Sequence, residues 1–344
     1  MQALSRNVGQ GRGAVLAALA LLAVASLAWS GATGSVALSL ADLAAALADL
    51  VRGGPGRHGT LAATLLELRL GRALTAFVTG AALALAGVMM QALLRNPLAD
   101  PYVLGISAGA SVGALAALLF MWATWTVDAA AFAGAVAVSL LLYLLARADL
   151  RAGGAAEGGT SLLLLTGVIV HSACMAAVTL MLSIAPDNRL RSMVFWMMGE
   201  LGGAPLRWLP WLVLAAALLF ALRCARALNV MALHAEAAAT LGVRVGALRK
   251  ALFFCSALLT ASAVTSAGSI GFVGLIVPHA VRFALGSDHR LLIPAATLAG
   301  GTFLVLADTV ARTIAAPQQL PVGVITAMIG APVFLYQLHR LRRA

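Results

Sequence analysis

Long apolar runs, separated by short polar or glycine-rich segments, follow one another along the chain from residue 14 to residue 338. A helix that crosses a bilayer needs about 20 mainly apolar residues. The pattern therefore predicts an all-α membrane protein with about ten transmembrane helices per subunit, in a single domain. The predicted spans are residues 14–30, 70–94, 104–122, 129–146, 161–184, 208–222, 251–267, 270–286, 291–309 and 322–338.

Two further segments have a helical period but are too polar or too short to span. In residues 35–51, leucines recur at helical spacing opposite Asp42 and Asp49, which predicts an amphipathic helix at the membrane surface. Residues 192–201 carry Phe195 and Trp196 and predict a second interfacial helix.

The first apolar run, residues 14–30, follows a polar start with Arg6 and Arg12 and on its own also fits a signal peptide. No small-residue cleavage site stands out in so alanine-rich a run. We therefore expect a retained first span, with the signal peptide as the alternative.

The composition agrees with a membrane protein. Hydrophobic residues make up 62% of the chain and charged residues 10%, whereas soluble domains have about 25% charged residues. The formal net charge of +11 rests almost wholly on arginines that lie between apolar runs, which favours membrane topology over nucleic-acid binding. More of these arginines fall on the side of the two termini, so the positive-inside rule predicts that both termini are cytoplasmic.

Small residues mark the faces on which the spans are expected to pack closely. Gly80 and Gly87 lie seven apart in the second span, and Gly105, Gly109 and Gly113 follow at intervals of four in the third. Such stripes let membrane helices approach closely.

A polar break separates the second and third spans. It contains Asn96, Pro97, Asp100 and Pro101, and each proline removes a backbone donor and disfavours helix at the residue before it. Polar backbone next to apolar helices is tolerated at a membrane surface, or inside where protein or water satisfies it. The break is therefore either a turn between spans or a discontinuous helix near a permeation path.

Motifs for catalysis and nucleotide binding are absent from the sequence. The single lysine, Lys250, is not preceded by the glycines of a phosphate-binding loop, and there are no paired carboxylates and no H-E-x-x-H or G-x-S-x-G motif. Cys174, Cys224 and Cys255 lie in apolar runs and are expected to be core residues. We expect no enzyme activity, no bound metal and no cofactor in this chain.

Three motifs carry a family resemblance. They are Asn96-Pro-Leu-Ala-Asp-Pro followed by Leu104-Gly-Ile-Ser-Ala-Gly-Ala, then Gly271-Phe-Val-Gly-Leu-Ile-Val-Pro-His-x-x-Arg282, and the last span from Leu320. They resemble the FecCD, or type II, permeases of ABC importers for vitamin B12, haem and ferric siderophores.

The resemblance runs from about Arg69 to Leu338 and implies an assembly. Two permease copies form the pathway as a homodimer in the bacterial inner membrane. Two ATPase subunits use ATP on the cytoplasmic side, and a periplasmic substrate-binding protein delivers the chelate. Alternating access is the implied mechanism, with cobalamin, a ferric siderophore or haem as cargo and no nucleic-acid partner.

The resemblance also implies a cytoplasmic gate and an ATPase contact. The gate residues are Asn96, Pro97, Leu98, Thr160 and Ser161; the alternative for the last two is a helix cap. In the loop of residues 228–245, the E-A-A-x-x-x-G pattern and the following cation imply ATPase coupling, with a solvated loop as the alternative. The coupling residues are Glu236, Ala237, Ala238, Gly242 and Arg244.

Three arginines match positions that receive acidic side chains of the binding protein in the B12 branch. Arg69 and Arg72 match an Arg-Leu-Pro-Arg pattern with Gly71 in place of proline, which is expected to loosen the helix start. Arg312 closes an Ala-Asp-x-x-Ala-Arg pattern. Guanidinium groups suit carboxylates, and the alternative is snorkelling at the interface.

His171 and Asp308 bear on mechanism. An ionisable residue within a membrane helix is a functional candidate, so His171 is a possible pathway residue, with a helix-to-helix hydrogen bond as the alternative. Asp308 is the main carboxylate available to a rival function, an ion-coupled secondary transporter that works without an ATPase.

Overall fold

The structure is a computed structural model that describes residues 2–34, 36, 38–53, 60–151, 159–202, 207–233 and 235–341. Within these ranges every regular element is a helix. The elements are α1 (Gln2–Ala32), α2 (Leu40–Gly53), α3 (Leu61–Leu94), the 3₁₀ helix η1 (Pro101–Leu104), α4 (Ile106–Leu119), α5 (Thr124–Arg151), α6 (Gly159–Ile184), α7 (Asp187–Met197), α8 (Leu209–Leu233), α9 (Ala235–Thr240), α10 (Val245–Ala267), α11 (Val273–Leu285), α12 (His289–Thr313) and α13 (Val322–Leu341).

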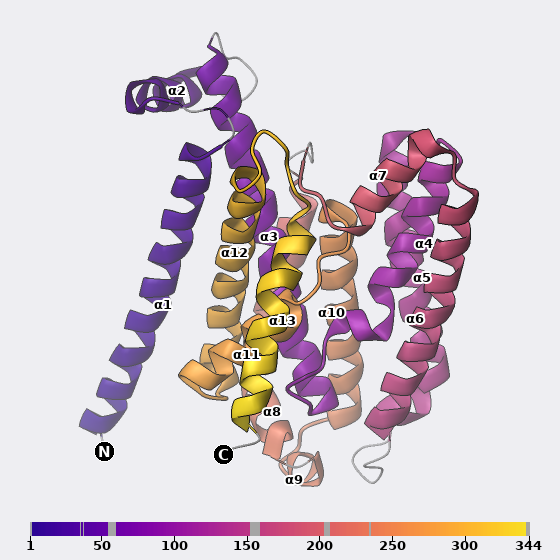
Figure 1. Cartoon of the computed structure of the whole chain (residues 1–344). Coiled ribbons are helices and arrows are strands. Elements are labelled where there is room, and N and C mark those ends of the chain that lie inside the picture. The colour runs from indigo at the N-terminus through magenta and orange to yellow at the C-terminus, as the bar shows by residue number, and fades with distance from the viewer. Residues whose placement is uncertain are drawn as a thin grey trace.

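The long helices run roughly along one axis, with α2 lying across one end and α9 at the other (Figure 1). We call these the α2 end and the α9 end. The N-terminus of α1 and the C-terminus of α13 both lie at the α9 end, and α7 lies at the α2 end (Figure 1).

Seven of the described helices are long and apolar enough to cross a membrane, and three shorter apolar helices accompany them. The seven segments are Gly11–Ala32, Leu61–Leu94, Thr124–Arg147, Leu162–Ile184, Leu209–Ala232, Val245–Ala267 and His289–Thr313; the shorter ones are Ile106–Leu119, Val273–Leu285 and Val322–Tyr336. The all-helical, multi-span architecture is confirmed, and ten crossings stay a prediction.

Helix α3 is the centre of the fold and contacts α1, α2, α8, α10, α11 and α12. A Cβ atom added to Gly80 would lie 2.3 Å from the carbonyl oxygen of Gly300 in α12, and one added to Gly87 would lie 1.8 Å from that of Gly274 in α11. Backbones this close leave no room for a side chain, which confirms the close packing predicted for Gly80 and Gly87.

Helices α4 and α5 pack by the same device. A Cβ atom on Gly109 would lie 2.6 Å from the carbonyl oxygen of Gly134, and one on Gly113 would lie 2.0 Å from that of Ala130. The third glycine of the predicted stripe, Gly105, faces α6 instead.

The helix that contains the second predicted span, residues 70–94, begins before that span. Helix α3 starts at Leu61, where the Thr60 hydroxyl accepts a hydrogen bond from the Ala63 N–H at 3.3 Å and so caps the helix. Gly71 therefore lies inside α3, and the expectation that it loosens the start of the helix is wrong.

Other predicted boundaries move because helices continue through polar residues. Helix α8 extends past residue 222 to Leu233 and carries the exposed Arg223 and Arg226, whose long side chains reach away from the apolar surface. Helix α10 begins at Val245. The segment predicted as a loop at residues 228–245 is thus mostly helix in its described part, with a turn after α9. Helix α7 begins at Asp187 rather than at residue 192.

Candidate functional site

Polar residues within the break after α3 form hydrogen bonds to its backbone. Arg95 adopts a left-handed conformation (φ 49°) as the C-cap of α3. The Asn96 side-chain oxygen accepts a hydrogen bond from the Leu98 N–H at 2.9 Å, and the Asp100 carboxylate accepts one from the Tyr102 N–H at the same distance. These short-range bonds give partners to the Leu98 and Tyr102 N–H groups, which lie where the two prolines interrupt the hydrogen bonds of a regular helix.

The segment then turns back into the helical body. Figure 1 shows α4 starting above the level at which α3 ends. The discontinuous-helix interpretation therefore describes this segment better than a simple surface turn.

Two contacts fix the break against the rest of the fold. The Tyr102 hydroxyl accepts a hydrogen bond of 2.7 Å from the N–H of Ile270, in the linker between α10 and α11. Gly105 is left-handed (φ 79°), and a Cβ atom there would lie 3.0 Å from the backbone nitrogen of His171 in α6. Only glycine meets both demands at this position.

The predicted gate residues are placed in part. Asn96 and Leu98 are half-buried and Pro97 is exposed, and Asn96 and Pro97 line one cavity together with Arg282 of α11. The structure thus brings the first gate segment against α11. The backbone of Thr160 and Ser161 lies at the start of α6, but their side chains lie outside the described residues.

The predicted coupling residues surround α9 at the α9 end. The N–H of Gly242 donates to the Ala239 carbonyl at 3.0 Å, and the N–H of Val243 donates to the Ala238 carbonyl at 2.9 Å. This pair of bonds ends the helix in a Schellman motif, with Gly242 left-handed (φ 82°). Leu241, which is 71% exposed, projects at the turn.

Arg244 is exposed after this turn, and Ala238 is buried. The side chains of Glu236 and Ala237 lie outside the described residues. The arrangement presents a short helix, a rigid turn and an apolar tip at the surface.

An ion cluster at the α2 end holds two of the predicted docking arginines. Asp308 is fully buried and lies in α12. Its carboxylate accepts hydrogen bonds of 3.0 Å from Arg72 Nε and 2.8 Å from Arg72 Nη2. Its other oxygen lies 3.2 Å from Arg312 Nε. Two guanidinium groups thus share one carboxylate.

The cluster continues into neighbouring segments. Arg312 Nη2 donates to the Ser30 hydroxyl of α1 at 2.7 Å, and Arg72 Nη1 donates to the Gln319 side-chain oxygen at 2.7 Å. Arg69 donates to the backbone carbonyls of Ala32 and Val36. Arg69 and Arg312 are 7% and 5% exposed, and their predicted docking to a binding protein stays a prediction. Their side chains join α1 and the segment after it to α3 and α12.

The sequence offered only part of this cluster. Asp308 and Arg312 lie four residues apart in a helix, a spacing that predicts an ion pair. Arg72 lies far away along the chain, and no sequence signal pairs it with Asp308. Because Asp308 is already neutralised by two cations, it is poorly suited to bind a coupling ion.

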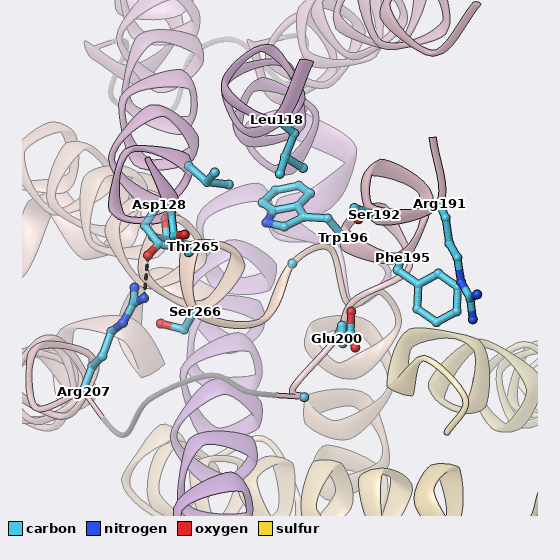
Figure 2. A pocket seen from close by; sticks show the side chains of 14 residues that line it. Leu118, Asp128, Arg191, Ser192, Phe195, Trp196, Glu200, Arg207, Thr265 and Ser266 are labelled. Atoms are coloured by element: carbon cyan, nitrogen blue, oxygen red, sulfur yellow. Dashed lines mark hydrogen bonds and ion pairs between the residues drawn. The ribbon is translucent and has the colours of Figure 1, made fainter. Parts of the chain in front are cut away.

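A cavity of about 480 Å³ opens at the α2 end beside α7. Figure 2 shows the Trp196 indole beside Leu118, the Asp128–Arg207 ion pair on one wall and the Glu200 carboxylate on another. The Arg191 guanidinium lies 5.4 Å from the centre of the Phe195 ring, a cation–π contact. The walls thus offer aromatic surface and both signs of charge.

This cavity adjoins the ion cluster. A Cβ atom added to Gly202, which lines the cavity, would lie 3.0 Å from Glu200 Oε1 and 3.5 Å from Arg72 Nη1. No sequence signal groups Asp128 with Glu200 and Arg207, because Asp128 lies in α5 whereas Glu200 and Arg207 lie between α7 and α8.

His171 is half-buried in α6 beside the break. Its Nδ1 is buried and has no hydrogen-bond partner among the described residues, so the alternative of a helix-to-helix bond finds no support at this atom. Within the part of the chain that the structure describes, no three His, Cys, Asp or Glu side chains gather as a metal site.

Comparisons with known proteins decide the family. The model of the FecCD transport family matches residues 19–340. The chain belongs to the FecCD transport family. The family predicted from the motifs is therefore confirmed, and it is a family of transport permeases.

Named relatives within the family are similar over most of their length. The hemin transport system permease protein HmuU of Yersinia pestis is 41% identical over 287 residues, which cover 80% of this chain and 83% of that protein. The cobalamin import system permease protein BtuC of Halobacterium salinarum is 44% identical over 279 residues, covering 79% and 72%.

A solved structure supports the FecCD fold. A metal-chelate type ABC transporter in an inward-facing conformation matches with a TM-score of 0.79 and 29% identity, covering 95% of this chain and 99% of that one. This chain is accordingly a multi-span ABC transporter permease.

Proposed function

We propose that this FecCD permease moves a bulky metal chelate across the inner membrane as the membrane subunit of an ATP-driven importer. The observation that carries the proposal is the similarity, at 40% identity or above, to permeases named for hemin and for cobalamin. The permeases named for hemin and for cobalamin have similar sequence identities to this chain. We therefore propose a haem or a corrinoid as the cargo, and a ferric siderophore is the third candidate to test.

Two copies of the chain would form the pathway between them, with both termini in the cytoplasm. The α9 end is then cytoplasmic, and the α2 end is periplasmic. The broken segment with Asn96, Pro97 and Leu98 would narrow the cytoplasmic side of the path, together with Thr160 and Ser161.

ATPase subunits would seat on α9 and the turn that follows it. The exposed Leu241 and the rigid turn at Gly242 support this, because an apolar tip on a fixed turn suits insertion into a groove. Glu236, Ala237, Ala238 and Arg244 would complete the contact.

A binding protein would deliver the chelate at the α2 end. Arg72 keeps 12% of its side chain exposed, and its Nη1 lies close to Gly202, which lines the cavity beside α7. It is better placed to meet an acidic partner than the more buried Arg69 and Arg312, and its Nη1 would exchange the exposed bond to Gln319 for one to that partner.

Transport in proteoliposomes tests the whole proposal. The chain is coexpressed with the ATPase and binding protein encoded beside it, and uptake of radiolabelled cobalamin, haem and a ferric siderophore is compared with and without ATP. We expect ATP-dependent uptake of one cargo. Uptake driven by an ion gradient without the ATPase would refute the importer and support a secondary transporter.

Charge reversal tests the two contacts separately. Glu236→Lys is expected to abolish ATPase copurification, and Arg72→Glu to abolish binding-protein capture, each with loss of uptake. Arg290→Glu, an exposed residue at the α9 end, is the control and should keep both contacts. Unchanged assembly and uptake in the first two variants would remove these residues from the proposal.

A further inference from the structure

A second cavity, of about 260 Å³, lies at the α9 end between the ends of α3, α8 and α11 and the start of α12. It is separate from the cavity of Figure 2, which lies at the α2 end. Its polar lining residues are Gln91, Arg95, Asn96, Arg282, Ser287 and His289.

The charge around this cavity is positive. Arg95 and Arg282 both line it, and none of its lining residues is acidic. The nearby carboxylate of Asp288 is engaged elsewhere: it accepts a hydrogen bond from Asn229 at 2.7 Å and pairs with Arg12 at 2.8 Å. Two guanidinium groups around one space, without a carboxylate in its wall, favour an anion.

His289 supplies an independent sign of a ligand. It is 3% exposed, and its Nδ1 lies 2.8 Å from the side-chain oxygen of Asn229. Because the Asn229 amide nitrogen donates to Asp288, its oxygen is the acceptor, and Nδ1 of His289 carries the proton. The other ring nitrogen, Nε2, is buried without a partner among the described residues.

Gln91, in α3, is a second buried side chain with one acceptor that has no partner among the described residues. It is 2% exposed, and its side-chain nitrogen donates to the Leu275 carbonyl at 3.3 Å. Its Oε1 is buried without a partner among the described residues. Four of the residues that line the cavity are thus two cations and two side chains that each carry a buried acceptor without a partner among the described residues. A ligand with a negative charge and hydroxyl donors fits this set.

We propose that this cavity binds a phosphate group, carried either by the headgroup of a hydroxyl-bearing anionic phospholipid or by free phosphate. Phosphate oxygens meet the guanidinium groups of Arg95 and Arg282, as arginine commonly binds phosphate. Hydroxyl groups, from a glycerol headgroup or from a protonated phosphate, donate to His289 Nε2 and Gln91 Oε1. The cavity lies at an end of the helix bundle, where basic pockets of membrane proteins meet lipid headgroups.

The occupant would also contact the predicted gate segment. Asn96 and Pro97 line the same cavity, so a bound phosphate would tie the break after α3 to α11 and α12. This proposal goes beyond the transport function and depends on neither the cargo nor the ATPase.

Ligand binding to the purified chain in detergent tests the site. Short-chain phosphatidylglycerol, short-chain phosphatidylcholine and inorganic phosphate are titrated in turn, with chloride at equal ionic strength as the salt control. Binding is followed by native mass spectrometry for the lipids and by thermal shift for all ligands. Saturable binding of phosphatidylglycerol but not phosphatidylcholine identifies a lipid site, and a response to inorganic phosphate alone identifies free phosphate.

Variants show whether the ligand occupies this cavity. Arg95→Gln and Arg282→Gln are each expected to weaken binding about tenfold or more, since each removes a charge-assisted hydrogen bond. Arg282→Lys keeps the charge and should lose less. Arg290→Gln, an exposed neighbour outside the cavity, should bind as the wild type does.

The design keeps a folding defect apart from a binding defect. Arg95 is exposed, so its variant should keep the wild-type gel-filtration profile even if the Arg282 variant does not. The proposal is overturned if neither phosphate ligand binds saturably, or if Arg290→Gln loses as much affinity as Arg95→Gln.

Discussion

The two ends of α12 hold their charges in opposite ways. Near its C-terminal end, the buried Asp308 is shared by two guanidinium groups, and hydrogen bonds from those groups reach α1. At its first turn, Asp288 is partly exposed and pairs with Arg12 and Asn229, while Arg95 and Arg282 face a cavity beside it. In the first arrangement the carboxylate is buried between two guanidinium groups, whereas in the second the carboxylate is partly exposed and two arginines line a cavity.

Removing the shared carboxylate should have the largest effect. Asp308→Ala leaves Arg72 and Arg312 facing one another in a buried place, and an uncompensated buried charge costs about 3–5 kcal/mol. Equilibrium unfolding in mixed detergent micelles measures the loss. Asp128→Ala is the matched control: its pair with Arg207 is partly exposed, so it should cost less than about 1 kcal/mol. If Asp308→Ala lost no more unfolding free energy than Asp128→Ala, the buried cluster around Asp308 would not stabilise the fold more than a surface ion pair.

Ser30→Ala should have an intermediate effect. It removes the 2.7 Å bond between the Ser30 hydroxyl and Arg312, and a hydrogen bond to a charged group contributes about 1.5–3 kcal/mol. The same unfolding assay applies. In the control variant Ser172→Ala, the lost hydroxyl bonds only its own helix and is exposed, so the change should stay within about 0.5 kcal/mol. A Ser30 variant as stable as this control would mean that the hydroxyl bond does not help to hold α1 to Arg312, which also donates to the Ser30 carbonyl.

Asp288→Asn should have the smallest effect, and one that depends on pH. The hydrogen bond from Asn229, followed by the Arg290 N–H and the nearby Arg12, lowers the pKa of Asp288 below its ordinary value of 3.8, against the opposing effect of burial. A lowered pKa adds stability above the ordinary value and loses it as the pH falls through the folded value.

Thermal unfolding midpoints of wild type and Asp288→Asn, measured from pH 6 to pH 3, test this. The wild-type advantage should be constant above about pH 5 and shrink at lower pH. An advantage that stays the same down to pH 3 would contradict the assigned partners of Asp288.

Much of the helical architecture could be predicted because it depends on local pattern. The apolar runs placed the long helices, and the spacing of Gly80 and Gly87 marked the face of α3 that meets α11 and α12. Helix ends were placed less well. Thr60 caps α3 earlier than the apolar run suggests, and α8 continues through Arg223 and Arg226, because a helix near a membrane surface tolerates long charged side chains.

The site was harder to predict, because its contacts join distant segments. The pattern of arginines at residues 69, 72 and 312 was visible, but their partners include backbone carbonyls and Ser30, which carry no sequence signal. The turn at Gly242 was predictable, since a left-handed position after a short helix favours glycine. The cavity lined by Arg95, Arg282 and His289 draws on separate helices and becomes visible only in three dimensions.

The hydrogen bond from Ile270 to the Tyr102 hydroxyl has a mechanical consequence. It joins the break before α4 to the linker before α11. The two short helices α4 and α11 are therefore connected through one hydrogen bond. Gly105, set against the backbone of His171, adds α6 to the same joint. The hydrogen bond and this close contact thus join α4, α6 and the start of α11 at one point of the fold.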